Sequence, residues 1–234
     1  MGWGAPLREA RFVHRPNRFI VHARIEGGEV VAHLADSGRL RELLVPGRRM
    51  GLRAEPPSAE RATRWTALLV EAEEGGGWVS VSTTVPNLLV RRALADGALP
   101  EFGGWRLERW EVPFGASRLD FLLERRDGRR MYVEAKSVTL VEDGVALFPD
   151  AVTTRGARHL EELIRAVDEG HEAAALFVLQ RPDARRIVAA RRIDPLFADT
   201  LERARAAGVR LLGRRCSVGW EGVRLGERVE VGVG

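Results

Sequence analysis

The chain has 234 residues, of which 45% are hydrophobic and 30% charged, a composition typical of folded globular proteins. It excludes a largely disordered chain, and the lack of any run of about 18 apolar residues excludes a transmembrane helix. A single cysteine, Cys216, excludes an internal disulfide and a cysteine-based zinc site. The first residues show no apolar stretch followed by small residues, which argues against a secretory signal and predicts a cytoplasmic protein.

The basic residues are almost all of one type. Lys and Arg together number 37 against 33 acidic residues, a net charge of +4, and Lys136 is the single lysine. Arginine supplies positive charge equally well, so a position that keeps lysine can require a compact ammonium group or an amine that can lose its proton. Alternatively, Lys136 is a lysine left by chance in a composition biased toward arginine. The residues around Lys136 decide between these two interpretations.

The first third of the chain predicts short strands joined by turns. Closely spaced strands of this length indicate a small all-β barrel or sandwich. Proline, glycine and polar residues predict a loop at 55–64 and a tight turn at 74–77. The predicted strands are 18–24, 29–33, 49–53, 66–73 and 78–81.

Beyond about residue 82, helices and strands alternate. Helices are predicted at 87–99 with Asn87 as the N-cap, at 153–169 before Gly170, and at 195–207 before Gly208. The predicted strands are 105–112, 118–123, 131–140, 173–179 and 209–212, with hairpins near 142–144 and within 217–233. This order predicts an α/β domain with a mixed sheet, and we expect the chain to divide into residues 1–82 and 83–234.

Three residues on consecutive predicted strands could share one face of that sheet. Glu134 and Lys136 are two residues apart on a strand, so they project from the same face about 7 Å apart. Joining the apolar faces of the two strands places Asp120 with them. A two-residue turn at positions 127 and 128 would instead place Asp120 opposite Ala135, so we predict a loop of odd length or a bulge.

Two carboxylates and a lysine on one face suit the chemistry of phosphodiester cleavage. Aspartate and glutamate oxygens bind Mg²⁺ or Mn²⁺, and such an ion polarises a phosphodiester. The lysine can orient water and stabilise charge on the phosphoryl oxygens. The pattern resembles the PD-(D/E)xK nucleases, although the proline before the aspartate is missing. The alternative is a surface salt bridge between Lys136 and a carboxylate.

At these residues the chain resembles the sugar fermentation stimulation protein A family over nearly its full length. The matching stretches are AHLADSGRLRELLVPG, TTVPNLLVRRAL, SRLDFLL, YVEAKSVTLVEDGVALFPDAVTTRGARHLEEL and LFVLQRPDA. The resemblance implies an N-terminal OB-like barrel, a restriction-endonuclease-like C-terminal domain and nucleic-acid binding. It places Asp120, Glu134 and Lys136 on the nuclease-like triad. The preceding helix offers only Asp96 where nucleases usually have another acid, which favours one metal ion over two.

Four further residues are candidates for contacts with nucleic acid. Gln180, at the end of a buried strand, either points into the same cleft, where it supports the site or contacts a phosphate, or is a strand-end side chain bonded to water. Arg155, at a helix start, is placed to clamp a phosphate. His159, one turn later, is either a proton carrier or an ordinary helix-face residue, and we favour the second interpretation. Ser37 and Arg39, with Gly38 between them, lie in a loop that an OB barrel can present to a strand of nucleic acid. Trp65 and Trp78 are candidates for stacking on bases.

The sequence therefore predicts a DNA-binding protein with a Mg²⁺- or Mn²⁺-dependent nuclease site and no base selectivity. RNA remains open as a substrate, and a dimer remains open as the assembly. A second hypothesis is a DNA-binding regulator of sugar metabolism genes whose nuclease-like scaffold does not cut. Metal binding without cleavage would select that second hypothesis.

Overall fold

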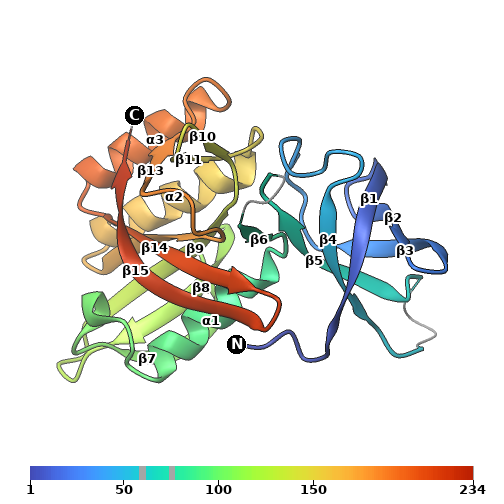
Figure 1. The fold of residues 1–234 in the computed structure, drawn as a ribbon. Coiled ribbons are helices and arrows are strands. Elements are labelled where there is room, and N and C mark those ends of the chain that lie inside the picture. Colours follow the sequence, from blue (N-terminus) through green and yellow to red (C-terminus); the bar gives the residue numbers. More distant parts are fainter. Residues whose placement is uncertain (58–61, 74–76, 234) are drawn as a thin grey trace.

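The computed structural model describes residues 1–57, 62–73 and 77–233 (Figure 1). The predicted loop at 55–64 and the predicted turn at 74–77 fall partly outside these residues. The described strands form one six-stranded and one nine-stranded sheet. No helix in the described ranges has the length and apolar character needed to cross a membrane.

The six-stranded sheet closes into a barrel, shown on the right of Figure 1. Its strand order is β3-β2-β1-β4-β5-β6, and an additional parallel pairing of β3 with β5 joins the two sides, so β1 to β5 form the closed barrel. Small and branched side chains, among them Val21, Ala32 and Leu52, fill its core. The strands are β1 (Leu7–Asn17), β2 (Ile20–Ile25), β3 (Gly28–Leu34), β4 (Arg49–Ala54), β5 (Trp65–Glu71) and β6 (Trp78–Ser80).

The nine-stranded sheet is mixed, as the sequence predicts. Its order is β10-β11-β13-β15-β14-β12-β9-β8-β7. β12 runs parallel to both β9 and β14, whereas β7, β8 and β9 are antiparallel. The strands are β7 (Arg106–Phe114), β8 (Ser117–Glu124), β9 (Arg130–Val138), β10 (Val141–Glu142), β11 (Val145–Phe148), β12 (Glu172–Leu179), β13 (Arg186–Ala189), β14 (Arg210–Gly219) and β15 (Gly222–Gly232).

Helices cover both faces of the nine-stranded sheet. The helix α1 (Thr84–Ala95) packs on one face, while α2 (Thr154–Asp168) and α3 (Pro195–Ala206) pack on the other. A short 3-10 turn, Pro100–Phe102, follows α1. Because the sheet is enclosed on both sides, β9 and β12 are almost continuously buried and lack the alternation of a half-exposed strand.

Several elements differ from their predicted form. β1 and β13 were not expected, and β14 continues to Gly219, so its hairpin partner begins at Gly222. The prediction of Asn87 as an N-cap is wrong, because α1 begins three residues earlier with Thr83 as its N-cap. β1 is hard to recognise because only Ala10 and Phe12 are fully buried among its many charged residues.

The hairpin between β8 and β9 confirms the predicted odd-length loop. Phe121 pairs with Val133 and Glu124 with Arg130, and Arg125 and Arg129 close the turn through a backbone hydrogen bond. Three residues remain at the tip of this turn. The register therefore places position 120 opposite position 134, as the predicted site requires.

Candidate active site

The ladder between β8 and β9 ends just before the three candidate residues. The last backbone pair is Phe121 with Val133. One step further, the Ala135 N–H donates to Asp120 Oδ2 at 2.8 Å, and the Asp120 N–H donates to Glu134 Oε2 at 3.3 Å. Carboxylates thus replace backbone partners where the strands separate, and this separation brings Asp120 and Glu134 together.

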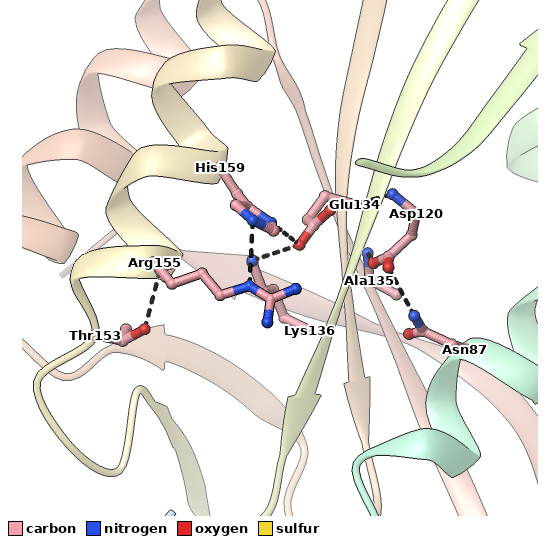
Figure 2. A network of polar contacts seen from close by, with 9 residues as sticks. Asn87, Asp120, Glu134, Ala135, Lys136, Thr153, Arg155 and His159 are labelled. Atoms are coloured by element: carbon pink, nitrogen blue, oxygen red, sulfur yellow. Dashed lines mark hydrogen bonds and ion pairs between the residues drawn. The ribbon is translucent and has the colours of Figure 1, made fainter. Parts of the chain in front are cut away.

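Glu134 is the centre of a buried polar network (Figure 2). Lys136 Nζ donates to Glu134 Oε1 at 2.9 Å, and the Nδ1 atom of His159 contacts the same oxygen. Glu134 and Lys136 are 3% and 7% exposed, so the interpretation of this pair as a surface salt bridge is wrong. Burial alone raises the pKa of Glu134, but the Lys136 ammonium and the His159 hydrogen bond outweigh it and lower the pKa to about 2.

Helix α2 supplies the histidine. Thr153 Oγ1 caps the helix by accepting from the Gly156 N–H at 2.9 Å. Arg155 and His159 are four residues apart and therefore lie on the same helix face. Arg155 Nε donates to His159 Nε2 at 3.4 Å, which leaves Nδ1 to donate to Glu134. The expectation of an ordinary helix-face residue is wrong for His159, because this side chain is 3% exposed and supports Glu134.

A side chain of helix α1 binds the second carboxylate, that of Asp120 on β8. Asn87 Nδ2 donates to Asp120 Oδ1 at 2.7 Å. Burial and the neighbouring Glu134 carboxylate raise the pKa of Asp120 from 3.8 to about 7, against the opposing effects of Ala135, Lys136 and Asn87. Asp96, the one acid of the predicted helix, is the C-cap of α1 and forms an exposed ion pair with Arg92. Asn87 therefore stands at the position where a helix contacts Asp120.

A cleft of about 420 Å³ gives access to these residues. It lies between the end of the barrel and the opened edge of β8 and β9. The barrel and the segment after it contribute Arg18, Asp36, Ser37, Gly38, Thr83 and Asn87; the mixed sheet and its loops contribute Asp120, Glu134–Ser137, Thr139, Phe148–Thr153, Arg155 and Gly156.

The barrel wall of the cleft is fixed in place. Asp150 Oδ2 accepts from the Arg39 N–H at 2.8 Å and the Leu40 N–H at 3.4 Å. Gly38 permits this approach, since a Cβ there would lie 2.4 Å from Asp150 Oδ2. From the barrel side, Arg15 donates to the carbonyl oxygens of residues 18, 36, 38 and 39. The loop is thus bonded to the barrel and to the segment before α2.

The four residues expected to contact nucleic acid lie in different places. Ser37 and Arg155 line the cleft. The Arg39 side chain is exposed, but Arg39 is not among the lining residues and uses its backbone N–H on Asp150. Gln180 is fully buried, and its Nε2 donates to Ser137 Oγ and the Ser82 carbonyl. A side chain without exposed surface cannot touch a phosphate in this structure, whereas the bond to the cleft residue Ser137 agrees with the alternative that Gln180 supports the site from behind.

Comparison with known sequences decides the family. The family model described as "Sugar fermentation stimulation protein RE domain" matches residues 84–222, and the "SfsA N-terminal OB domain" matches residues 13–81. The chain belongs to the sugar fermentation stimulation protein family. The OB barrel and the mixed-sheet domain expected for this family are therefore both confirmed.

Individual relatives match over nearly the whole chain. The sugar fermentation stimulation protein homolog of Moorella thermoacetica is 45% identical, covering 92% of this chain and 91% of that protein. The homolog of Chloroflexus aurantiacus is 44% identical, covering 97% and 86%. The structure of Pyrococcus furiosus SfsA in complex with Ca²⁺ is 29% identical with a TM-score of 0.90, covering 99% of this chain and 97% of that one.

Proposed function

We propose that this protein cleaves phosphodiester bonds in nucleic acid with a divalent cation held by Asp120 and Glu134. The observation that carries the proposal is the position of the single lysine: Lys136 is buried in the cleft and bonded to Glu134, which lies opposite Asp120. We further propose that residues 1–82 bind nucleic acid while residues 83–234 form the PD-(D/E)xK-like unit that cuts it.

The donor atoms fit a hard divalent cation. Asp120 and Glu134 offer carboxylate oxygens at the cleft, and these are the ligands that Mg²⁺ and Mn²⁺ prefer. Burial and the neighbouring Glu134 carboxylate disfavour the ionisation of Asp120, as its raised pKa indicates, and a cation would relieve that cost. The Ca²⁺ in the related Pyrococcus furiosus structure supports a divalent site, because Ca²⁺ also takes oxygen ligands. When bound, Mg²⁺ or Mn²⁺ supplies charge that polarises the phosphodiester.

The remaining residues have distinct tasks in this proposal. The Lys136 ammonium neutralises negative charge that develops on the phosphoryl oxygens. His159 and Lys136 together hold Glu134 ionised and in one orientation. Arg155 is exposed at the cleft, where its guanidinium can bind a neighbouring phosphate through two donors. Asn87 in place of a helix acid favours one metal ion over two.

The test is incubation of the purified protein with end-labelled DNA and RNA in Mg²⁺, Mn²⁺ or EDTA. Wild type should cut only with metal. Lys136→Ala should not cut, and Lys136→Arg should not cut either, because a planar guanidinium cannot take the place of a compact ammonium in a buried site. Arg92→Ala, on the exposed face of α1, is the matched control and should behave as wild type. Full activity in Lys136→Arg would contradict the mechanism.

One observation favours the second candidate, a regulator that binds DNA without cutting. The helix that contacts Asp120 supplies the amide of Asn87 instead of an acid. In that case calorimetry would detect Mn²⁺ binding that is lost in Asp120→Asn, while no substrate is cut under any condition. For both candidate functions, nucleic acid should bind without base selectivity, and its affinity should fall steeply as the salt concentration increases.

A further inference from the structure

The turn that carries the cleft residue Arg18 also exposes an aromatic ring. Phe19 follows Arg18 in the turn between β1 and β2, and Arg18 lines the cleft. Phe19 is 51% exposed, although aromatic rings are usually buried. Phe19 is not itself a lining residue, but it directly follows one in the chain. The two tryptophans considered for stacking neither line the cleft nor adjoin a lining residue, and Trp78 packs edge-on against Trp220 and beneath Arg49. Phe148 lines the cleft, but its ring packs edge-on against Phe177 and Phe197, so Phe19 is the exposed aromatic side chain beside the cleft among the described residues.

The Phe19 ring is presented on a fixed backbone. Its N–H donates to Asn17 Oδ1 at 2.9 Å, and its carbonyl accepts from the Leu34 N–H at 2.8 Å. The preceding carbonyl, that of Arg18, accepts from Arg15 Nη2 at 2.6 Å. The His33 ring lies nearly parallel to Phe19, at 16° with centroids 6.4 Å apart. A ring held in this way loses little freedom when a flat group stacks on it.

Trp110, on β7, is also an exposed aromatic side chain. Trp110 is 47% exposed, but the Arg91 guanidinium covers its ring at 3.6 Å from the centroid. Phe19 has no such cation over its ring among the described residues. Apart from the His33 ring on one side, Phe19 is thus open to a flat partner, whereas a guanidinium covers the ring of Trp110.

The cleft itself favours a single strand over a duplex. Glu134 and Lys136 are almost buried, and the bonds from Asp150 to the loop at 36–40 join the two walls. A duplex brings two strands wound around each other, whereas one strand can thread between the walls. The cleft also carries four carboxylates (Asp36, Asp120, Glu134 and Asp150) against three cations (Arg18, Lys136 and Arg155). A single strand, with one charge per 3.4 Å instead of 1.7 Å, meets less repulsion there.

We propose that the substrate of this site is single-stranded nucleic acid, with one unpaired base stacked on Phe19 and the adjacent phosphate bound by Arg18. Stacking on an aromatic side chain accepts any base, because every base has a π-face, and this agrees with a lack of base selectivity. A paired base within a duplex offers no free face to Phe19. The inference rests on the proposed function, because it takes the cleft as the nucleic-acid site, but it is tested by binding and not by cleavage.

The experiment measures fluorescence anisotropy of labelled oligo-dT, oligo-U and a DNA duplex of equal length, in EDTA and in Ca²⁺. Single strands should bind more tightly than the duplex. Comparing oligo-dT with oligo-U shows whether the site prefers DNA or RNA. Phe19→Ala should weaken single-strand binding roughly tenfold, whereas Phe19→Trp should retain it. Arg18→Ala should reduce the slope of log affinity against log salt by about one. Phe19 is exposed, so these variants should fold, and circular dichroism checks this.

An abasic scan makes the test specific. Removing one base at successive positions should weaken wild-type binding at one position and leave Phe19→Ala insensitive there. Equal binding of duplex and single strand, or unchanged binding by Phe19→Ala, would overturn the inference even if the protein cuts DNA. Conversely, single-strand binding that depends on Phe19, with no metal-dependent cleavage, would sustain the inference and reject the proposed nuclease.

Discussion

The Asn87 amide donates a 2.7 Å hydrogen bond to Asp120 Oδ1, across 33 residues of sequence and from a different element. The bond fixes one oxygen of a carboxylate whose other oxygen accepts the Ala135 N–H. Asp120 therefore has little freedom to rotate. In the proposed nuclease this orientation would support catalysis, because a metal ligand displaced by about 1 Å lowers the rate strongly.

Asn87→Ala should consequently slow metal-dependent cleavage by about tenfold, or ~1.4 kcal/mol in activation free energy, with a small effect on thermal unfolding. Single-turnover cleavage rates and the melting temperature measure the two effects. Leu88→Ala, on the adjacent exposed position of α1, is the control and should change neither. A loss of stability as large as the loss of rate would assign Asn87 to folding alone.

The buried pair of Glu134 and Lys136 should couple strongly in stability. Lys136→Met leaves the Glu134 carboxylate buried without its ammonium partner, and we expect the free energy of unfolding to fall by about 3 kcal/mol. Adding Glu134→Gln to this variant removes the stranded charge and should recover most of the loss. Urea unfolding of the two single variants and the double variant measures the coupling.

An exposed ion pair provides the control for that cycle. Arg106 and Glu124 are 3.4 Å apart with side chains 75% and 28% exposed, so Arg106→Met should cost less than about 1 kcal/mol. Additive effects at Glu134 and Lys136 would mean that the two charges do not depend on each other. That result would contradict the network drawn in Figure 2.

The sequence was sufficient to predict the fold class and to place the three central residues. Asp120, Glu134 and Lys136 follow from the two-residue period of strands, and the odd-length hairpin loop follows from requiring them to share a face. Asn87 and His159 could not be placed in this way, because their partners depend on how α1 and α2 pack on the sheet. From the local pattern, Asn87 can be predicted only as a helix cap and His159 only as a helix-face residue. Their contacts with Asp120 and Glu134 depend on long-range packing.

The loop before residue 40 illustrates the same limit. The loop of Ser37, Gly38 and Arg39 was expected to face a strand of nucleic acid. In the structure the backbone of this loop binds Asp150, about 110 residues away in sequence. Gly38 fits because it has no side chain, and no sequence period indicates that requirement.

Gly38→Ala should therefore separate the two walls of the cleft. The added methyl group would lie 2.4 Å from Asp150 Oδ2, so the loop must move, and we expect a loss of about 1–3 kcal/mol in stability together with slower cleavage. Gly219→Ala is a matched control, since no atom lies within 4 Å of a Cβ at that position. The effect should shrink in an Asp150→Ala background, where the obstructing carboxylate is gone. An equal effect in both backgrounds would contradict this explanation.

Asp36, in the same loop, should make stability depend on pH. Burial raises its pKa from 3.8 to about 6, against the opposing hydrogen bond from the Gly38 N–H. Because the folded state binds the proton more tightly, the stabilisation is fully present below about pH 4 and is lost as pH rises through 6. The size of the change is about 3 kcal/mol. Asp36→Asn keeps an acceptor for the Gly38 N–H and should remove the pH-dependent contribution of Asp36. The free energy of unfolding of wild type, relative to that of Asp36→Asn, should therefore fall between pH 4 and pH 7. Urea unfolding at unit pH steps measures it, and parallel curves for the two proteins would show that Asp36 titrates normally.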